Sequence, residues 1–196
     1  MRTFILRARK SVTKPFDIDD LPAAGNMQVV ASCIGNALWV SNNVRSDTII
    51  HVILEGPPTP PLCVTFFGSS VKELPFDERG IAFLVNKAIK KAIKLGKGTK
   101  EIAPGITVSR TNFEDMVKHH QETSALFYLH PKGKNIHEVK FPENVTFVFG
   151  DYIGMPEKSE GFLEKLGAEQ VSLGRVTLFA SQCVTIVQHV LDMRLW

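Results

Sequence analysis

The sequence predicts a single α/β domain, residues 1–196, built on a mostly parallel β-sheet with helices on both faces. Strand-like and helix-like patterns alternate along much of the chain, which is typical of parallel strands joined by helices. The run from Thr48 to Leu54 is almost uniformly apolar and β-branched, as in a central parallel strand buried on both faces. The length of 196 residues, with 44% apolar and 22% charged residues, suits one ordinary globular domain.

Composition and charge exclude several classes of protein. No apolar run reaches the roughly 18 residues of a membrane span, and no secretory signal is recognisable, so we expect a cytoplasmic location. The three cysteines are odd in number and widely spaced, which argues against a disulfide framework and a zinc knuckle. A formal net charge of +3 is small, so any contact with nucleic acid must use a local basic patch.

The first part of the chain contains two predicted strands, one helix and one stiff loop. Residues 2–8 have the pattern of a strand with a basic exit, and Asn26 is placed to cap a helix that runs to Leu38. His51 lies within the apolar run, where a hydrogen-bonded core histidine is more common than a metal ligand. A proline-rich loop then leads into residues 63–67, which we expect to form a hairpin-like excursion.

Residues 77–95 have the clearest helical pattern, and Gly96 is the expected stop. The helix carries the largest basic cluster of the chain: Lys87, Lys90, Lys91, Lys94, Lys97 and Lys100. A solvated helix face explains such a cluster, and so does a stripe that follows a phosphate backbone. The Gly96-Lys97-Gly98 segment is not a phosphate-binding loop, because the first glycine of that motif and the strand before it are missing.

Three short elements follow. Residues 106–109 look like a strand, Thr111 or Asn112 caps a short helix, and residues 124–130 form a further strand that ends at Pro131. The histidines of this region and the next are His119, His120, His130 and His137. None has the spacing of a zinc site, so we predict that the protein binds no metal.

The last third of the chain contains two glycine turns at the ends of apolar strands. The first runs from Gly150 to Gly154 after residues 145–150, and the second surrounds Gly174 after residues 169–172. Helices are expected after Pro156 and around Cys183. In open α/β sheets, ligands bind at the carboxyl ends of strands, where backbone N–H groups are free. We therefore predict one small-molecule site made mostly from backbone.

Short blocks along the whole chain resemble a known family. They are Arg2-Thr-Phe-Ile-Leu-Arg-Ala8, Asp20-Leu-Pro22, Arg45-Ser-Asp47, Gly56-Pro-Pro58, Asp77-Glu-Arg79, Pro104-Gly-Ile-Thr-Val108, Tyr128-Leu-His130, Gly150-Asp151 with Ile153-Gly154, Val171-Ser-Leu-Gly174 and Cys183-Val-Thr-Ile186. In this order they resemble the archaeal tRNA (pseudouridine-54) N1-methyltransferases, which are knotted methyltransferases of the SPOUT class.

The resemblance implies a fold, a reaction and partners. The fold is a parallel sheet whose C-terminal part, approximately residues 125–196, threads a loop to form a trefoil knot, an exception to the usual rule against knots. S-adenosylmethionine binds in that knot, the protein forms a homodimer, and no membrane or metal is involved. The implied reaction is transfer of a methyl group to N1 of pseudouridine at position 54 of tRNA.

The resemblance also implies the residues of the site. The cofactor contacts carried over are Leu129, Gly150, Leu173, Gly174, Arg175, Val176, Thr177, Leu178 and Cys183. Cys183 is expected to contribute its backbone, because no motif supports a covalent cysteine mechanism. Candidates for handling the RNA are Arg7, Arg9, Asp77 and Arg79, although Asp77 is equally expected as a helix cap. No general base is recognisable, so the catalytic residue is unknown.

The sequence departs from the family at two positions. Members commonly have histidine where this chain has Tyr152 and again where it has Gln182. A related enzyme acting on another tRNA or rRNA pseudouridine therefore stays open, as does a non-catalytic RNA-binding protein of the same fold. A nucleotide-binding regulatory domain is less favoured, because the chain contains neither Gly-x-Gly-x-x-Gly nor a phosphate-binding loop.

Overall fold

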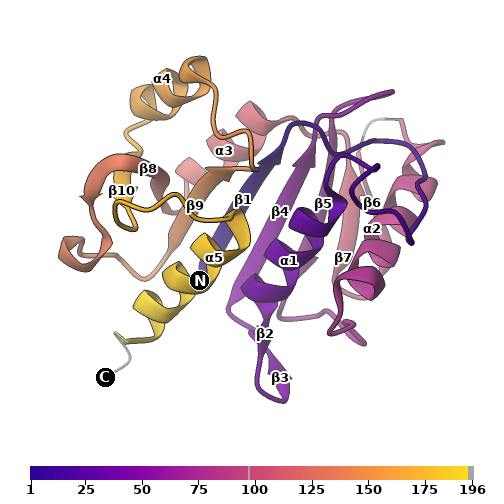
Figure 1. Cartoon of the computed structure of the whole chain (residues 1–196), viewed down its shortest axis with the longest axis horizontal. Helices are drawn as coiled ribbons and strands as arrows, with labels where there is room; N and C mark the ends of the chain where they lie inside the picture. Colours follow the sequence, from indigo (N-terminus) through magenta and orange to yellow (C-terminus); the bar gives the residue numbers. More distant parts are fainter. Residues whose placement is uncertain (97, 194–196) are drawn as a thin grey trace.

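One eight-stranded sheet runs through the computed structural model, which describes residues 1–96 and 98–193 (Figure 1). Its strands, in spatial order, are β10 (Glu169–Ser172), β8 (Ala125–Asn135), β9 (Val145–Gly150), β1 (Arg2–Ala8), β4 (Thr48–Leu54), β5 (Leu62–Phe67), β7 (Ile106–Ser109) and β6 (Thr99–Ala103). A separate small hairpin is formed by β2 (Trp39–Val40) and β3 (Asn43–Val44). The helices are α1 (Met27–Leu38), α2 (Glu78–Ala92), α3 (Phe113–Gln121), α4 (Glu157–Lys165) and α5 (Ala180–Asp192), with a 3-10 turn η1 (Ile136–Glu138).

The direction of the strands divides the sheet into two parts. From β10 to β4 all neighbours are parallel, and β4, β5, β7 and β6 are successively antiparallel. The predicted mostly parallel sheet is therefore confirmed, and so is the hairpin-like excursion, because β4 and β5 pair as a hairpin. The carboxyl ends of β1, β8, β9 and β10 consequently meet at one edge, which holds the site described below.

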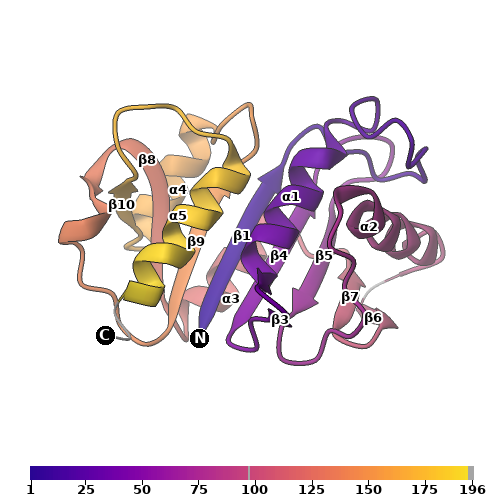
Figure 2. The same ribbon diagram turned by 60° about the horizontal axis from the view of Figure 1, so that its bottom comes forward.

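Helices cover both faces of the sheet, as predicted. Figure 2 shows α1 and α5 side by side on one face, and they pack on a cluster that includes Leu6, Val52 and Phe147. A second cluster on the other face joins Ile5 and Val148 to residues of α3 and α4. Neighbouring residues of a strand thus belong to opposite clusters, as strand geometry requires. No helix in the described part of the chain is long and apolar enough to span a membrane.

The helix starts agree with the caps expected from sequence, with one exception. The Asp77 carboxylate accepts a hydrogen bond from Gly80 N at 2.8 Å, and the Asn112 amide oxygen accepts one from Asp115 N at the same distance. Asn26 occupies the cap position of α1 but has a left-handed backbone (φ 59°) and makes no capping bond with its side chain. There, the tight turn through residues 25 and 26 starts the helix, rather than a side-chain cap.

Two element boundaries differ from the prediction, and one strand was not predicted. Strand β8 does not end at Pro131 but continues to Asn135, because a register shift in β10 lets Val171 pair with Lys134. Helix α2 ends at Ala92, before the expected stop at Gly96. Strand β6 was not predicted, since its residues Thr99 to Glu101 are exposed and polar and pair only at the edge of the sheet.

The C-terminal helix is fastened to the sheet by a charged cluster at its last turn. Both nitrogens of the Arg45 fork bond the Asp192 carboxylate, at 2.8 and 2.6 Å, and Arg2 Nη1 bonds the same carboxylate at 2.6 Å. Arg2 Nη1 also donates to Gln188 Oε1 at 2.7 Å. Partial burial acts to raise the pKa of Asp192, but the hydrogen bonds from Arg45 and Arg2 outweigh it and lower that pKa below 3.8.

His51 is a hydrogen-bonded core residue, as expected. Its Nδ1 lies 2.8 Å from Thr65 Oγ1, and its Nε2 lies 2.8 Å from His120 Nε2 on α3. Burial, followed by the neighbouring His120 and His119, lowers the pKa of His51 well below 6.5. Burial and His119 lower the pKa of His120 to about 4. Both rings are therefore neutral at pH 7, and one donates a hydrogen bond to the other.

We expect this pair to make the protein sensitive to acid. Because the folded pKa of His51 is depressed, the unfolded chain binds more protons below pH 6.5, so stability falls as the pH falls. One such histidine removes roughly 2 kcal/mol of the free energy of unfolding between about pH 7 and pH 5. The measurement is urea unfolding across this range for the wild type and for His51→Gln. The variant should have a flatter pH dependence, and parallel curves would contradict the assignment.

Candidate functional site

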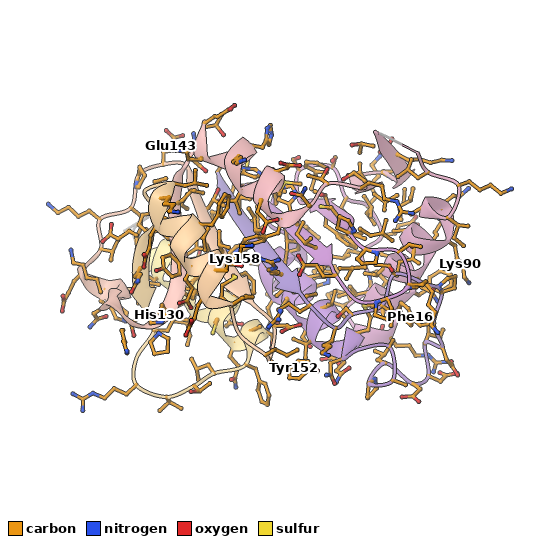
Figure 3. The ribbon with its side chains drawn as sticks, turned by 90° about the horizontal axis from the view of Figure 1, so that it is seen from above. Phe16, Lys90, His130, Glu143, Tyr152 and Lys158 are labelled. Carbon is orange, nitrogen blue, oxygen red and sulfur yellow. The ribbon has the colours of Figure 1, made fainter. Side chains whose placement is uncertain are left out.

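The two predicted glycine turns lie side by side at the carboxyl edge of the sheet and enclose a pocket of about 420 Å³. Its walls are the loop from Gly150 to Met155, the loop from Leu173 to Leu178, the middle of β8 and the first turn of α5. Figure 3 shows this edge from above, with His130 and Tyr152 on the same side of the molecule. The volume falls within the range of pockets that hold small ligands and cofactors.

The first loop folds back closely on its own strand. A Cβ atom on Gly150 would lie 2.6 Å from the carbonyl carbon of Gly154 and 2.9 Å from Met155 N, so only glycine fits at this position. Asp151 holds the loop, since its Oδ2 accepts a hydrogen bond from Arg9 N at 2.8 Å and its Oδ1 accepts one from Ile153 N at 3.0 Å. The carboxylate thereby ties the exit of β1 to the pocket wall.

The second loop is fastened to β8 through Ser172. The Ser172 hydroxyl donates to Pro131 O at 3.2 Å and accepts from Gly174 N at 3.2 Å. Gly174 has φ 126°, a backbone conformation that favours glycine. Beyond it, the Val176 and Phe179 side chains are 76% and 67% exposed. The loop is thus held at its base and presents apolar side chains at the pocket mouth.

The interior of the pocket is mostly apolar with a few polar groups. Phe149, Val171 and Ala180 line it and are themselves buried. Burial raises the pKa of the Cys183 thiol, which also lines the pocket, so this group is a neutral side chain rather than a nucleophile. The ionisable side chains in the lining are Asp151, His130 and Glu160, and His130 Nε2 lies 3.8 Å from Glu160 Oε1.

The predicted cofactor residues converge on this pocket. Leu129, Gly150, Leu173, Gly174, Val176, Thr177, Leu178 and Cys183 all line it. Arg175 does not line it and is exposed. Cys183 lies in the first turn of α5, which begins three residues earlier, at Ala180.

The predicted RNA-handling residues separate into two groups. Arg7 and Arg9 lie at the exit of β1 beside the pocket, whereas Asp77 and Arg79 lie at the start of α2. Arg7 is engaged: it donates to Glu55 at 2.9 Å and to Ser159 Oγ at 2.6 Å, and it lies over the Phe113 ring. Arg9 is half-buried, and no hydrogen bond or ion pair of its side chain occurs among the described residues.

The residues at the start of α2 have structural partners. Asp77 caps the helix, and Arg79 pairs with Asp19 at 2.5 Å, where both side chains are 63% exposed. Within one copy of the chain neither residue lines the pocket. The interpretation of Asp77 as a helix cap is therefore confirmed, while its role toward RNA stays a prediction.

The two positions that depart from the family differ in their surroundings. Tyr152 lines the pocket and is 55% exposed, so its ring stands at the mouth. Gln182 is not among the residues that line the pocket, and its Oε1 accepts a hydrogen bond from Phe179 N at 3.0 Å, which helps to cap α5. Of the two positions at which this chain differs from the family, Tyr152 is therefore the one whose side chain can contact a bound substrate.

Several lining residues were not predicted individually. Asp151, Met155 and Glu160 are examples. The sequence signals for Asp151 were its place directly after a strand and a glycine and its presence in the Gly150-Asp151 block of the family resemblance. Met155 and Glu160 reach the pocket from the loop before α4 and from α4 itself, which sequence spacing does not reveal. Over the described residues, no group of three or more His, Cys, Asp or Glu side chains could hold a metal ion.

Comparison with known proteins agrees with this geometry. A family model described as "Putative SAM-dependent RNA methyltransferase" matches residues 1–195. The chain is 36% identical over 201 residues to the tRNA (pseudouridine(54)-N(1))-methyltransferase of Methanocaldococcus jannaschii, covering 99% of this chain and 98% of the relative. It is 39% identical over 197 residues to the protein of the same name from Thermococcus gammatolerans, covering 98% and 97%.

A solved structure has a similar fold at low sequence identity. Archaeoglobus fulgidus Nep1 bound to S-adenosylhomocysteine superposes with a TM-score of 0.59 and 12% identity, covering 98% of this chain and 96% of that one. At this identity the likeness concerns the fold alone. The match of the family model and the identity to near-full-length relatives confirm the resemblance found in the sequence: the chain belongs to this family of SAM-dependent RNA methyltransferases.

Proposed function

We propose that the protein transfers a methyl group from S-adenosylmethionine to N1 of pseudouridine at position 54 of tRNA. The observation that carries the proposal is the identity of 36% to 39%, over nearly the whole chain, to relatives named for this reaction. The pocket at the carboxyl edge of the sheet supports it, because it combines apolar walls with closely approaching backbone.

The residues of the pocket fit S-adenosylmethionine. Leu129, Leu173 and Leu178 would pack against the adenine, and the exposed backbone of the two loops would supply its hydrogen bonds. Gly150 would allow the main chain to approach the ligand. We further propose that approximately residues 125–196 form one knotted cofactor-binding unit.

The reaction makes modest demands on the protein. The cofactor supplies a methyl group on a sulfonium: a carbon–nitrogen bond forms at N1, the carbon–sulfur bond breaks with its electrons left on sulfur, and the N1 proton passes to water. Alignment in a fixed site can supply about 7–11 kcal/mol, against roughly 3–5 kcal/mol for a positioned general base. Orientation of the two substrates by the pocket walls can therefore supply most of the rate acceleration. No residue is assigned as a general base.

Two residues at the pocket mouth are proposed to receive the target nucleotide. Arg9 has a side chain without protein partners among the described residues, and it is held beside the pocket by the Asp151 contact to its backbone. Tyr152 offers an exposed ring on which a base that has left its stack can lie. Arg7 is better suited to holding β1, α3 and α4 together, because its donors are occupied by Glu55, Glu114 and Ser159.

We also propose that the protein is a cytoplasmic homodimer that pairs through the face formed by α1 and α5. This face has a hollow of about 600 Å³, lined by residues of both helices and by the stacked rings of Trp39 and Phe76. Phe76 is 76% exposed and forms with Trp39 an aromatic patch at this hollow, and aromatic side chains are enriched at interfaces between protein chains. Light scattering in solution tests the pairing, and a monomer mass at micromolar concentration would exclude it.

The reaction is tested with purified protein, labelled S-adenosylmethionine and tRNA that carries either pseudouridine or uridine at position 54. We expect label only on the pseudouridine tRNA, and nuclease mapping should place it at nucleotide 54. Methylation of rRNA alone would select the related enzyme instead. RNA binding without measurable cofactor binding at millimolar concentration would select the non-catalytic alternative.

A further inference from the structure

A row of cations leads from the pocket mouth along the carboxyl edge of the sheet to the end of α2. We propose that this cationic track, which consists of Arg9, Lys10, Lys14, Lys90, Lys91 and Lys94, binds the sugar-phosphate backbone of the tRNA. The proposal rests on the proposed function and names the surface that holds the substrate away from the reacting nucleotide. Figure 3 shows Tyr152, Phe16 and Lys90 following one another along the long axis of the molecule.

The helical part of the track comes from the amphipathic pattern of α2. Val85, Ala88 and Ile89 are fully buried against the sheet, so Lys87, Lys90 and Lys91 face outward. Lys94 continues this exposed side in the turn that follows the helix. After Glu78 the helix contains no acid. Lys97 belongs to the same cluster in sequence but lies outside the described residues.

The loop from residue 9 to residue 16 connects the two ends of the track and is firmly attached. At the pocket, Arg9 N donates to Asp151 at 2.8 Å. In the middle, Thr13 Oγ1 donates to Gly56 O at 2.9 Å and accepts from Thr59 N at 2.8 Å. At α2, the side chain of Asn86, which is 4% exposed, donates to Phe16 O at 2.8 Å. The loop cations therefore have a defined position between the pocket and the helix.

The charges along the track are available to a partner. In the part of the chain that the structure describes, no ion pair involves Lys10, Lys14, Lys90, Lys91 or Lys94. The acids of the same loop, Asp17, Asp19 and Asp20, come after Phe16, and Asp19 pairs with Arg79 at the opposite end of α2. Positive and negative charges are thus separated along the helix.

A solvated face alone does not account for this arrangement. Lysines at the end of a helix are favoured by its dipole, which explains Lys90 and Lys91. The helix dipole does not explain Lys10 and Lys14, which lie more than seventy residues earlier in the chain. These two lysines continue the positive charge from α2 toward the pocket. A polyanion with regularly spaced phosphates matches a row of unpaired cations better than a compact ligand does.

The test uses charge-neutral variants that preserve helix propensity. Lys90→Gln/Lys91→Gln/Lys94→Gln removes the α2 part, and Lys10→Gln/Lys14→Gln removes the loop part. The matched control is Lys118→Gln/Lys140→Gln/Lys165→Gln, which removes three exposed lysines that lie away from the track. For each protein, the Kd for tRNA is measured between about 50 and 200 mM salt.

We expect the triple α2 variant to bind tRNA roughly tenfold more weakly near 0.15 M salt, with a salt slope reduced by about 2 to 3. The loop variant should reduce the slope by about 2, and the control by less than about 1. At saturating tRNA the kcat of both track variants should equal that of the wild type, with only KM raised. Cofactor affinity, measured by calorimetry, should be unchanged and shows that the variants are folded.

The outcomes separate this proposal from the proposed function. An unchanged slope in the α2 variant, or an equal change in the control, would overturn the track. An effect of the loop variant alone would also overturn it, because the track would not reach α2. If wild-type protein binds tRNA with a steep salt slope but methylates none, the proposed function fails while the binding measurements still decide the track.

Discussion

Replacing Gly150 by alanine is expected to weaken S-adenosylmethionine binding on the order of 100-fold. The added Cβ would lie 2.6 Å from the carbonyl carbon of Gly154 and 2.8 Å from its oxygen. Both are backbone atoms, so the loop that forms one wall of the pocket must move as a whole. If the displaced wall loses about two hydrogen bonds to the ligand, at roughly 1.4 kcal/mol each, the loss accounts for an effect of this size. Overpacking should also lower the free energy of unfolding by about 1–3 kcal/mol.

Calorimetric titration with the cofactor and urea unfolding measure the two effects. Gly161→Ala is the matched control, because a Cβ on Gly161 meets nothing within 4 Å and this glycine lies inside α4. Alanine should stabilise that helix slightly and leave cofactor binding unchanged. A cofactor Kd for Gly150→Ala close to that of the wild type would remove Gly150 from the proposed site.

Replacing Asp192 by alanine is expected to lower the free energy of unfolding by about 2–3 kcal/mol. The carboxylate neutralises Arg45, which is 17% exposed, and Arg2, which is 9% exposed. Without it, Arg2 keeps only the Asp47 carboxylate, 3.1 Å from its Nε, and Arg45 has no carboxylate partner among the described residues. The estimate is below the largest values for buried pairs because Asp192 itself is 37% exposed. The last turn of α5 should loosen first.

Thermal unfolding of the variant should show a Tm lower by roughly 5–10 °C. Asp19→Ala is the control for loss of one carboxylate from an ion pair, since Asp19 and Arg79 are each 63% exposed. That change should stay within about 0.5 kcal/mol of the wild type. If both variants lose the same stability, the cluster around Asp192 is no stronger than an ordinary surface pair.

Elements with a strong local pattern were predictable from the chain alone. The apolar run of β4, the amphipathic stripe of α2 and the glycine turns after β9 and β10 all lie where the sequence places them. Each is governed by residues a few positions apart, through hydrophobic periodicity, caps or backbone freedom. Most of the cofactor residues carried over from the family resemblance lie in those turns and line one pocket for the same reason, with Arg175 outside it. Leu129 reaches the pocket from β8 and Cys183 from the first turn of α5.

Elements that depend on a neighbouring strand were not predictable in the same way. Strand β8 passes through Pro131 because β10 pairs with its far end beyond a register shift. Strand β6 exists because β7 offers it an edge, although its own residues are mostly polar. Strand pairing of this kind depends on two segments together, so the sequence of either segment alone does not predict it.

The sequence by itself determined the fold class, the family and the position of the two glycine turns. Only the tertiary structure decided what the charged residues do: Arg7 bonds Ser159, Arg2 bonds Asp192, and Asp151 holds the backbone of Arg9. Their separations along the chain are 152, 190 and 142 residues. The physical reason is range: periodicity and capping act over one or two turns, whereas the partner of a charge is whichever group the packed sheet and helices bring within about 3 Å.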